Sequence, residues 1–124
     1  MGQSAAPATM STDILESVAK ASARTYEGSG HAAQVYEHGG LGPVLYEVSI
    51  PALGRVEIVE LAPPEGDEEL VKIRERRDAG VDIWAIVALE HLAAAHAKYR
   101  KVADRLQPWW IVDDQVVFGT PRVP

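Results

Sequence analysis

The sequence predicts an α/β (α+β) protein built on a mixed sheet, and three observations indicate this fold class. Residues 81–88 form an apolar run interrupted only by Asp82 and rich in β-branched and aromatic side chains, which is typical of a strand covered on both faces. Period-two alternation in residues 33–61 breaks into three short runs separated by Gly and Pro. Helical patterns precede and follow residues 81–88. We therefore expect this run to be the central strand, with helices packed against the sheet.

The length of 124 residues suits one domain with a single core. Residues 1–10 carry no charged side chain and, apart from methionine, no large apolar one, so we predict a disordered tail there and one domain over residues 11–124. The domain is expected to begin with a helix capped by Ser11 or Thr12 that runs to about Thr25, because carboxylates in its first turn favour the helix dipole.

The later elements follow from the same kind of signal. Acidic residues at one end and arginines at the other predict a second helix. Gly80 suits the position that ends this helix, because glycine takes positive φ without strain. An alanine-rich pattern predicts a longer helix ended by Pro108, and two aspartates mark a possible hairpin turn in the closing strand. The expected elements are strands over 34–38, 44–50 and 55–61, a helix over 65–80, the strand 81–88, a helix over 89–106, and a strand or hairpin over 109–118.

The register of the three-stranded meander predicts where its acidic side chains point. If Ile50 pairs with Arg55 across the turn, alternation places Glu47 and Glu60 on one face of the sheet and brings them near each other. Glu57 then points to the opposite face. Two carboxylates on adjacent strands are a possible site for Mg²⁺, which prefers oxygen ligands.

Composition excludes several classes of function. The hydrophobic fraction is 47%, and no apolar run approaches the ~20 residues that span a bilayer, so we expect a soluble protein with no membrane partner. The absence of cysteine excludes disulfides, thiolate nucleophiles and cysteine-based zinc sites, and it favours a cytoplasmic location. The net charge of -6 disfavours non-specific binding to nucleic acid, which needs clustered Lys and Arg.

The order helix, three-stranded meander, helix, strand is the core order of the PD-(D/E)XK, or restriction-endonuclease-like, superfamily. Within it, the sequence resembles the Uma2-type branch, in which an acidic strand residue precedes a Ser-Pro turn, the lysine lies in the following helix, and Ala-Gly-Val leads into a strand containing Trp. The resemblance implies that Glu60 is a metal ligand and that Lys72 positions the attacking water or the scissile phosphate. The matching segments are residues 59–63 (Val-Glu-Leu-Ala-Pro), Lys72, residues 79–81 (Ala-Gly-Val) and residues 84–87 (Trp-Ala-Ile-Val).

The sequence departs from the pattern of that family at several points. The family's aspartate lies four residues before the strand glutamate, where this chain has Val56. The nearest acid, Glu57, points the other way unless a bulge intervenes, and Glu47 is the possible substitute from the neighbouring strand. No E-x-K motif occurs on the third strand. The candidate metal ligands are therefore Glu47, Glu57 and Glu60, with Lys72 beside them.

Two further groups of residues are candidate binding surfaces. Alternation along a strand sends the indoles of Trp109 and Trp110 to opposite faces, so one is expected in the core and the other at an interface. We favour a homodimer formed through this region. The four histidines have no i, i+4 pair and are expected to be structural. The only basic surface of any length is expected to be a solvated face of the 89–106 helix, with nucleic-acid binding as the alternative; it comprises Lys98, Arg100, Lys101 and Arg105.

Two functions of different classes follow. The first, which we prefer, is a small non-catalytic binding or oligomerising module without a cofactor. The second is a Mg²⁺-dependent PD-(D/E)XK-like nuclease that hydrolyses phosphodiesters and is possibly degenerate, as the family resemblance implies. In the nuclease, the Mg²⁺ ion would polarise the phosphodiester and lower the pKa of a bound water.

Overall fold

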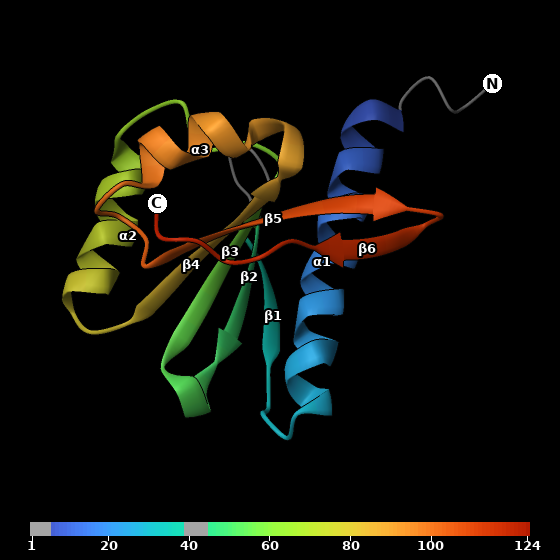
Figure 1. Ribbon diagram of the computed structural model, residues 1–124, viewed down its shortest axis with the longest axis horizontal. Coiled ribbons are helices and arrows are strands. Elements are labelled where there is room, and N and C mark those ends of the chain that lie inside the picture. The colour runs from blue at the N-terminus through green and yellow to red at the C-terminus, as the bar shows by residue number, and fades with distance from the viewer. Residues whose placement is uncertain (1–5, 39–44) are drawn as a thin grey trace.

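The computed structural model describes residues 6–38 and 45–124, and within them it has three α-helices and a six-stranded mixed sheet (Figure 1). This confirms the predicted fold class. The elements are α1 (Ala6–Gly28), β1 (Gln34–His38), β2 (Leu45–Ile50), the short 3₁₀ helix η2 (Pro51–Leu53), β3 (Arg55–Glu60), α2 (Glu68–Asp78), β4 (Asp82–Ala88), the 3₁₀ helix η3 (Leu89–His91), α3 (Leu92–Tyr99), β5 (Arg105–Val112) and β6 (Gln115–Phe118).

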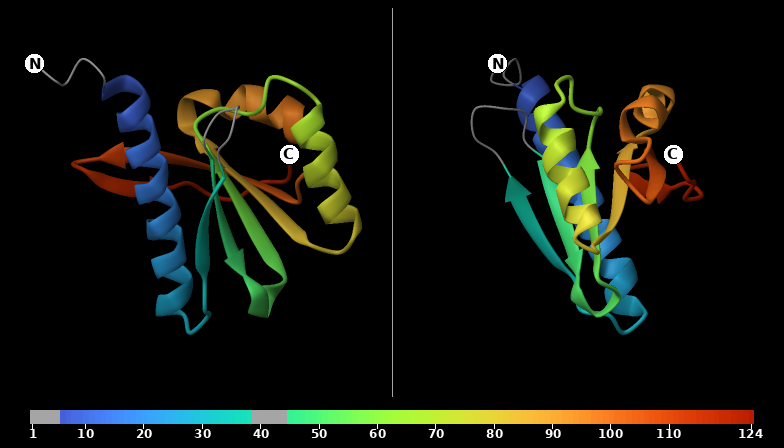
Figure 2. Two further views of the ribbon diagram at one scale, coloured as in Figure 1. Left: turned by 180° about the vertical axis from the view of Figure 1, so that it is seen from behind. Right: turned by 90° about the vertical axis from the view of Figure 1, so that its left-hand side faces the viewer.

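The strands lie in the sheet in their order along the chain (Figure 2). β1, β2 and β3 form an antiparallel meander in which Ile50 pairs with Arg55, as predicted. β4 is parallel to both β3 and β5, so residues 82–88 form the interior strand that the apolar run predicts. β6 returns antiparallel to β5. The turn predicted at residues 38–42 lies largely outside the described residues.

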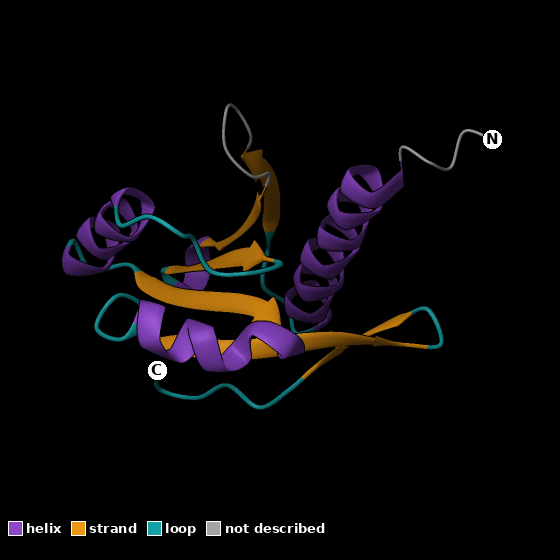
Figure 3. Ribbon diagram, turned by 90° about the horizontal axis from the view of Figure 1, so that it is seen from above, coloured by secondary structure: helices purple, strands orange, loops and turns teal. Residues whose placement is uncertain are grey.

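Helices cover both faces of the sheet, with α1 on one side and α2 and α3 on the other (Figure 3). Each face has its own apolar cluster, and the nearly continuous apolar sequence of β4 supplies both, because alternate side chains point to opposite faces. The cluster under α2 and α3 includes Ile58, Ile83, Ala85, Tyr99 and Leu106. The cluster under α1 includes Val18, Val48, Val59, Ile86 and Trp109.

The N-terminal helix begins at Ala6, inside the segment that we predict as a tail. The predicted caps Ser11 and Thr12 therefore lie within the helix, and that start is wrong. Local sequence explains the difference, because alanine has the highest helix propensity and Pro7 lies in the first turn, where its missing N–H has no intrahelical partner to lose. The helix continues to Gly28.

The helix predicted over residues 89–106 is also wrong in its second half, since α3 ends at Tyr99. The chain then turns through Lys101, whose φ of 62° is left-handed, and enters β5 at Arg105. Pro108 therefore lies inside a strand and does not end a helix. Its nitrogen faces the β6 side, where Gly119 donates to the backbone oxygen of Pro108 at 2.8 Å. Proline has no N–H to return that bond, and the Gln107 side chain donates to the backbone oxygen of Gly119 at 2.9 Å in its place.

The closing hairpin is confirmed, with Asp113 and Asp114 as its two turn residues. Both have positive φ, 48° and 62°, as a two-residue type I′ turn requires. In Figures 1 and 3 the tip of this hairpin extends past α1, so the distal part of β5 and β6 projects from the body. None of the helices in the described residues has the length and apolar content needed to cross a lipid bilayer.

Candidate functional site

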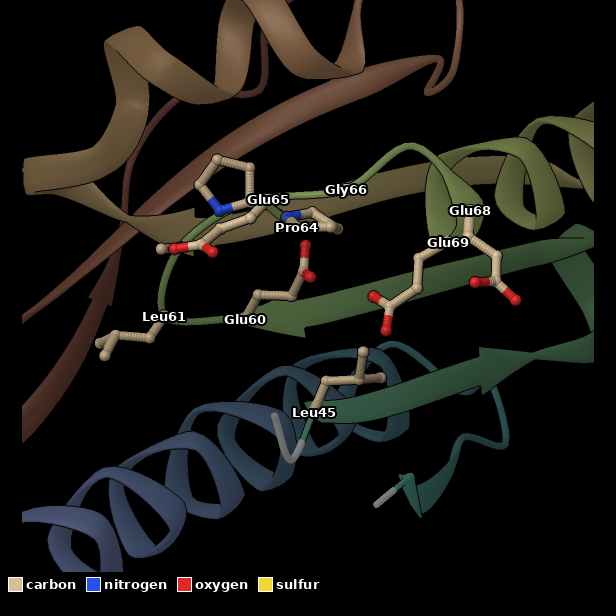
Figure 4. Close-up of a pocket in the computed structure, with 10 residues that line it drawn as sticks. Leu45, Glu60, Leu61, Pro64, Glu65, Gly66, Glu68 and Glu69 are labelled. Carbon is tan, nitrogen blue, oxygen red and sulfur yellow. The ribbon is translucent and has the colours of Figure 1, made fainter. Parts of the chain in front are cut away.

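A pocket of about 470 Å³ lies where β3 ends and α2 begins (Figure 4). β3 ends there because Pro63 and Pro64 cannot continue a sheet ladder. The segment that follows crosses to α2 and closes the side of the pocket. The lining combines apolar walls with carboxylates and includes Leu45, Glu60, Leu61, Ala62, Pro63, Pro64, Glu65, Gly66, Glu68 and Glu69.

Glu60, the last residue of β3, is the buried acid of this pocket, with 5% of its surface exposed. The Tyr99 hydroxyl donates a hydrogen bond to its Oε1, and the Trp109 indole donates to its backbone oxygen at 3.2 Å. Burial, reinforced by the negative charge of Glu69, raises the pKa of Glu60 to about 8. At neutral pH this carboxyl is therefore largely protonated.

Glu47 and Glu60 share a face of the sheet, as the register predicts, but each carboxylate has its own neighbours. Arg76 donates two hydrogen bonds to Glu47, at 2.8 and 2.9 Å. These bonds raise the pKa of Arg76 and hold the pair as a bidentate fork. Arg76 thus engages the carboxylate that we expect to complete the metal site.

Lys72 lies on the solvent side of α2, where its side chain is 71% exposed. Its amine is 3.8 Å from a carboxylate oxygen of Glu68, four residues earlier on the same helix, and the two form an exposed ion pair. Lys72 does not line the pocket. Within the described residues it forms no hydrogen bond or ion pair with Glu60.

Glu57 lies on the opposite face of the sheet, which corrects its place among the candidate metal ligands. β3 pairs in unbroken register with β2 and β4 through Glu57, so no bulge turns its side chain toward Glu60. Its carboxylate is buried and accepts hydrogen bonds from Ser22 and from Tyr26, the latter at 2.6 Å. Burial raises the pKa of Glu57, and the two donors oppose that rise.

Glu47, Glu57 and Glu60 therefore do not converge on one point. Within residues 6–38 and 45–124, no group of three or more His, Cys, Asp or Glu side chains has the geometry to hold a metal ion.

The structure contains a half-buried polar network on the α1 face that was not predicted from the sequence. Arg55 donates to Asp82 at 2.8 Å and to the Tyr26 hydroxyl at 3.0 Å, and its guanidinium lies 4.1 Å from the centre of the Trp84 ring. The signal that could have predicted it is Asp82, the single charge in an otherwise apolar strand. The parallel register of β3 and β4 places Asp82 opposite Arg55.

The predicted basic surface is not one helical face, because α3 ends before three of its four members. Lys98 donates to the backbone oxygen of Glu65 at 3.0 Å, and Arg105, on β5, donates to the backbone oxygen of Asp104 at 2.8 Å. Arg100 and Lys101 lie in the exposed turn between α3 and β5.

The two tryptophans point to opposite faces, as alternation predicts. Trp109 is 5% exposed and belongs to the cluster under α1. Trp110, on the other face, is only partly buried and lies against Gly119, where an added Cβ would come within 3.1 Å of its ring.

Comparison of the chain with protein-family models, with curated proteins and with solved structures found no significant match.

Proposed function

We propose that this protein is a non-catalytic module that self-associates, with β6 of one copy pairing antiparallel to β6 of a second copy. The single observation that supports this most strongly is the projecting hairpin of β5 and β6. A two-stranded hairpin is marginally stable in water unless it is covered, and this one extends beyond the helix beside it.

The backbone of β6 is suited to pairing with another strand. Gly119 donates to the backbone oxygen of Pro108, so alternate residues of β6 face β5 and the remaining two, Val116 and Phe118, direct their N–H and C=O groups to the open edge. The strand Gln115–Phe118 contains no charge and no proline, the usual devices that block edge pairing. Because the same strand serves both copies, a twofold axis satisfies the pairing.

The side chains of the hairpin are apolar on both faces. Val116 and Phe118 pack against the cluster under α1. Beyond the body, Ile111 is 42% exposed and Val112 is 48% exposed. Both residues are on β5, so in the paired sheet they lie beside the continuous apolar surface that the two β6 strands form, and the charged tip residues remain in water.

Sedimentation velocity on three proteins tests the proposal. The wild type is expected to sediment as a dimer. Val117→Lys, which places a cation in the middle of the paired edge, is expected to sediment as a monomer. Val71→Lys introduces the same substitution at an exposed position of α2 and is the matched control, expected to remain dimeric. A monomeric wild type, or a dimeric Val117→Lys with native circular dichroism, would overturn the proposal.

The nuclease is the alternative that the element order favours, since helix, meander, helix, strand is the order observed and Glu60 ends β3 beside a pocket. The placement of Glu57 and Lys72 counts against it. Calorimetric titration of Mn²⁺ into the wild type and Glu60→Ala separates the two functions. Stoichiometric binding lost in the variant, together with cleavage of DNA or RNA, would replace the module by an enzyme.

A further inference from the structure

The pocket at the end of β3 contains an excess of negative charge that the protein does not neutralise. Four of its ten lining residues are glutamates, and none is lysine or arginine. The Lys72–Glu68 pair is long and solvent-exposed, and Lys98 contacts a backbone oxygen at the rim and not a carboxylate. Glu65 and Glu69 form no ion pair with a cation in the described part of the chain, and Glu60 adds a further negative charge when it loses its proton.

Glu60 provides a second and independent observation. It is about nineteen-twentieths buried, since 5% of its surface is exposed, and Tyr99 bonds only its Oε1. Within the described residues, Oε2 has no hydrogen bond or ion pair. Every fully enclosed side-chain oxygen of these residues does have a hydrogen-bond partner, so Oε2 is not fully enclosed. Oε2 is therefore open to the pocket, and Figure 4 shows the carboxylate pointing inward toward Pro64.

The walls around this carboxylate are apolar. The apolar residues that line the pocket are Leu45, Leu61, Ala62, Pro63 and Pro64. A volume of about 470 Å³ is in the range of sites that take small organic ligands. Methylene groups would be buried against these walls at a gain of roughly 0.8 kcal/mol each.

We propose that this pocket binds an alkylammonium group, with Oε2 of Glu60 as the acceptor at its base, Glu69 as the nearby second charge, and the leucine and proline side chains against the alkyl chain. The cation displaces the proton that Glu60 holds at neutral pH, so that Glu60 accepts as a carboxylate. A primary ammonium supplies three donors and needs no fixed coordination geometry. A divalent metal would need several oxygen ligands at fixed distances, and the described residues do not assemble them. This inference does not depend on self-association through β6.

The alkylammonium group has two possible sources, a free polyamine or a lysine side chain of another protein. Isothermal titration with spermidine and with Nα-acetyl-lysine amide distinguishes them, because the tighter-binding probe indicates the source. 1-Pentanol, which has an alkyl chain without charge, is expected to bind at least tenfold more weakly than pentylamine. The ¹⁵N–¹H spectrum locates the site, with the largest shifts expected at the amides of Leu61 and Gly66.

Glu60→Gln keeps the size of the side chain and an acceptor for Tyr99, and it is expected to weaken pentylamine binding at least tenfold. Glu75→Gln, at an exposed position of α2 outside the pocket, is the matched control and is expected to bind as the wild type does. Pocket shifts absent at saturating pentylamine, equal binding by Glu60→Gln, or equal binding of 1-pentanol would each overturn the proposal. So would stoichiometric Mn²⁺ binding that pentylamine does not displace.

Discussion

Replacing Glu60 by glutamine is expected to stabilise the protein at alkaline pH. The folded chain holds a proton on Glu60 up to about pH 8, whereas an unfolded chain releases it near the ordinary value of 4.5. Between these two values the unfolded state binds fewer protons than the folded state, so the free energy of unfolding falls as pH rises. Below about 4.5 both states are protonated, and this loss is absent.

The magnitude follows from the same difference. A rise from 4.5 to about 8 at roughly 1.36 kcal/mol per pH unit amounts to about 5 kcal/mol. Glutamine is neutral at every pH and retains an acceptor for the Tyr99 hydroxyl, so Glu60→Gln escapes this loss. Its advantage over the wild type is expected to grow from near zero below about pH 4.5 to about 5 kcal/mol above about pH 8.

Urea denaturation across this pH range measures the difference directly. Glu65→Gln is the control, because Glu65 lines the same pocket but is exposed. Its curve is expected to run parallel to that of the wild type. If the difference between Glu60→Gln and the wild type were constant with pH, the burial of an ionisable carboxyl at this position would be refuted.

Three further predictions concern the fold and its assembly. Arg76→Met removes two hydrogen bonds to Glu47 and is expected to cost about 1–3 kcal/mol in urea denaturation, whereas Arg74→Met, at an exposed position of the same helix, should cost less than about 0.5 kcal/mol. Gly119→Ala places a Cβ 2.7 Å from Cγ of Pro108 and is expected to cost about 1–3 kcal/mol; Pro108→Ala in the same chain should recover part of that loss, and strict additivity in this double-mutant cycle would exclude the clash. Self-association is expected to tighten as salt is added, because each copy carries a net charge of -6; a dissociation constant that rises with salt in sedimentation equilibrium would indicate an ionic interface instead.

The strands were predictable because their signals are local. Residues 34–38 appear as β1 without any change of boundary, and the Ile50–Arg55 pairing followed from one short turn. The turn at Asp113 and Asp114 was also predictable from its residue types, because aspartate tolerates a left-handed backbone better than most residues.

The end of α3 was not predictable from the same signals. The helical pattern continues through Val102, Ala103 and Leu106, all of which are buried, but they reach the core from a turn and a strand. Pairing of β5 with β4 overrides local helix propensity there. Pro108, which suggested a helix end, is tolerated because the Gln107 side chain donates to the backbone oxygen of Gly119 in place of the N–H that proline lacks.

The candidate site was predicted in part. The shared face of Glu47 and Glu60 followed from alternation, but their partners depend on which residues of α2 and α3 pack above the sheet. Arg76 and Tyr99 supply those partners from 29 and 39 residues away, and periodicity within single segments carries no information about such pairs. The resemblance to PD-(D/E)XK proteins directed attention to Glu60 and stays a prediction.

Amide hydrogen exchange at Val116 and Phe118 tests the pairing of β6 most directly. Both N–H groups face the open edge of the sheet, so in a monomer they exchange at the rate of exposed amides. If β6 pairs with β6, their protection is expected to rise with protein concentration, in parallel with the dimer fraction, while the Val117 amide, already bonded within the hairpin, changes less. Rapid exchange of Val116 and Phe118 at every concentration at which the protein is dimeric would contradict that pairing.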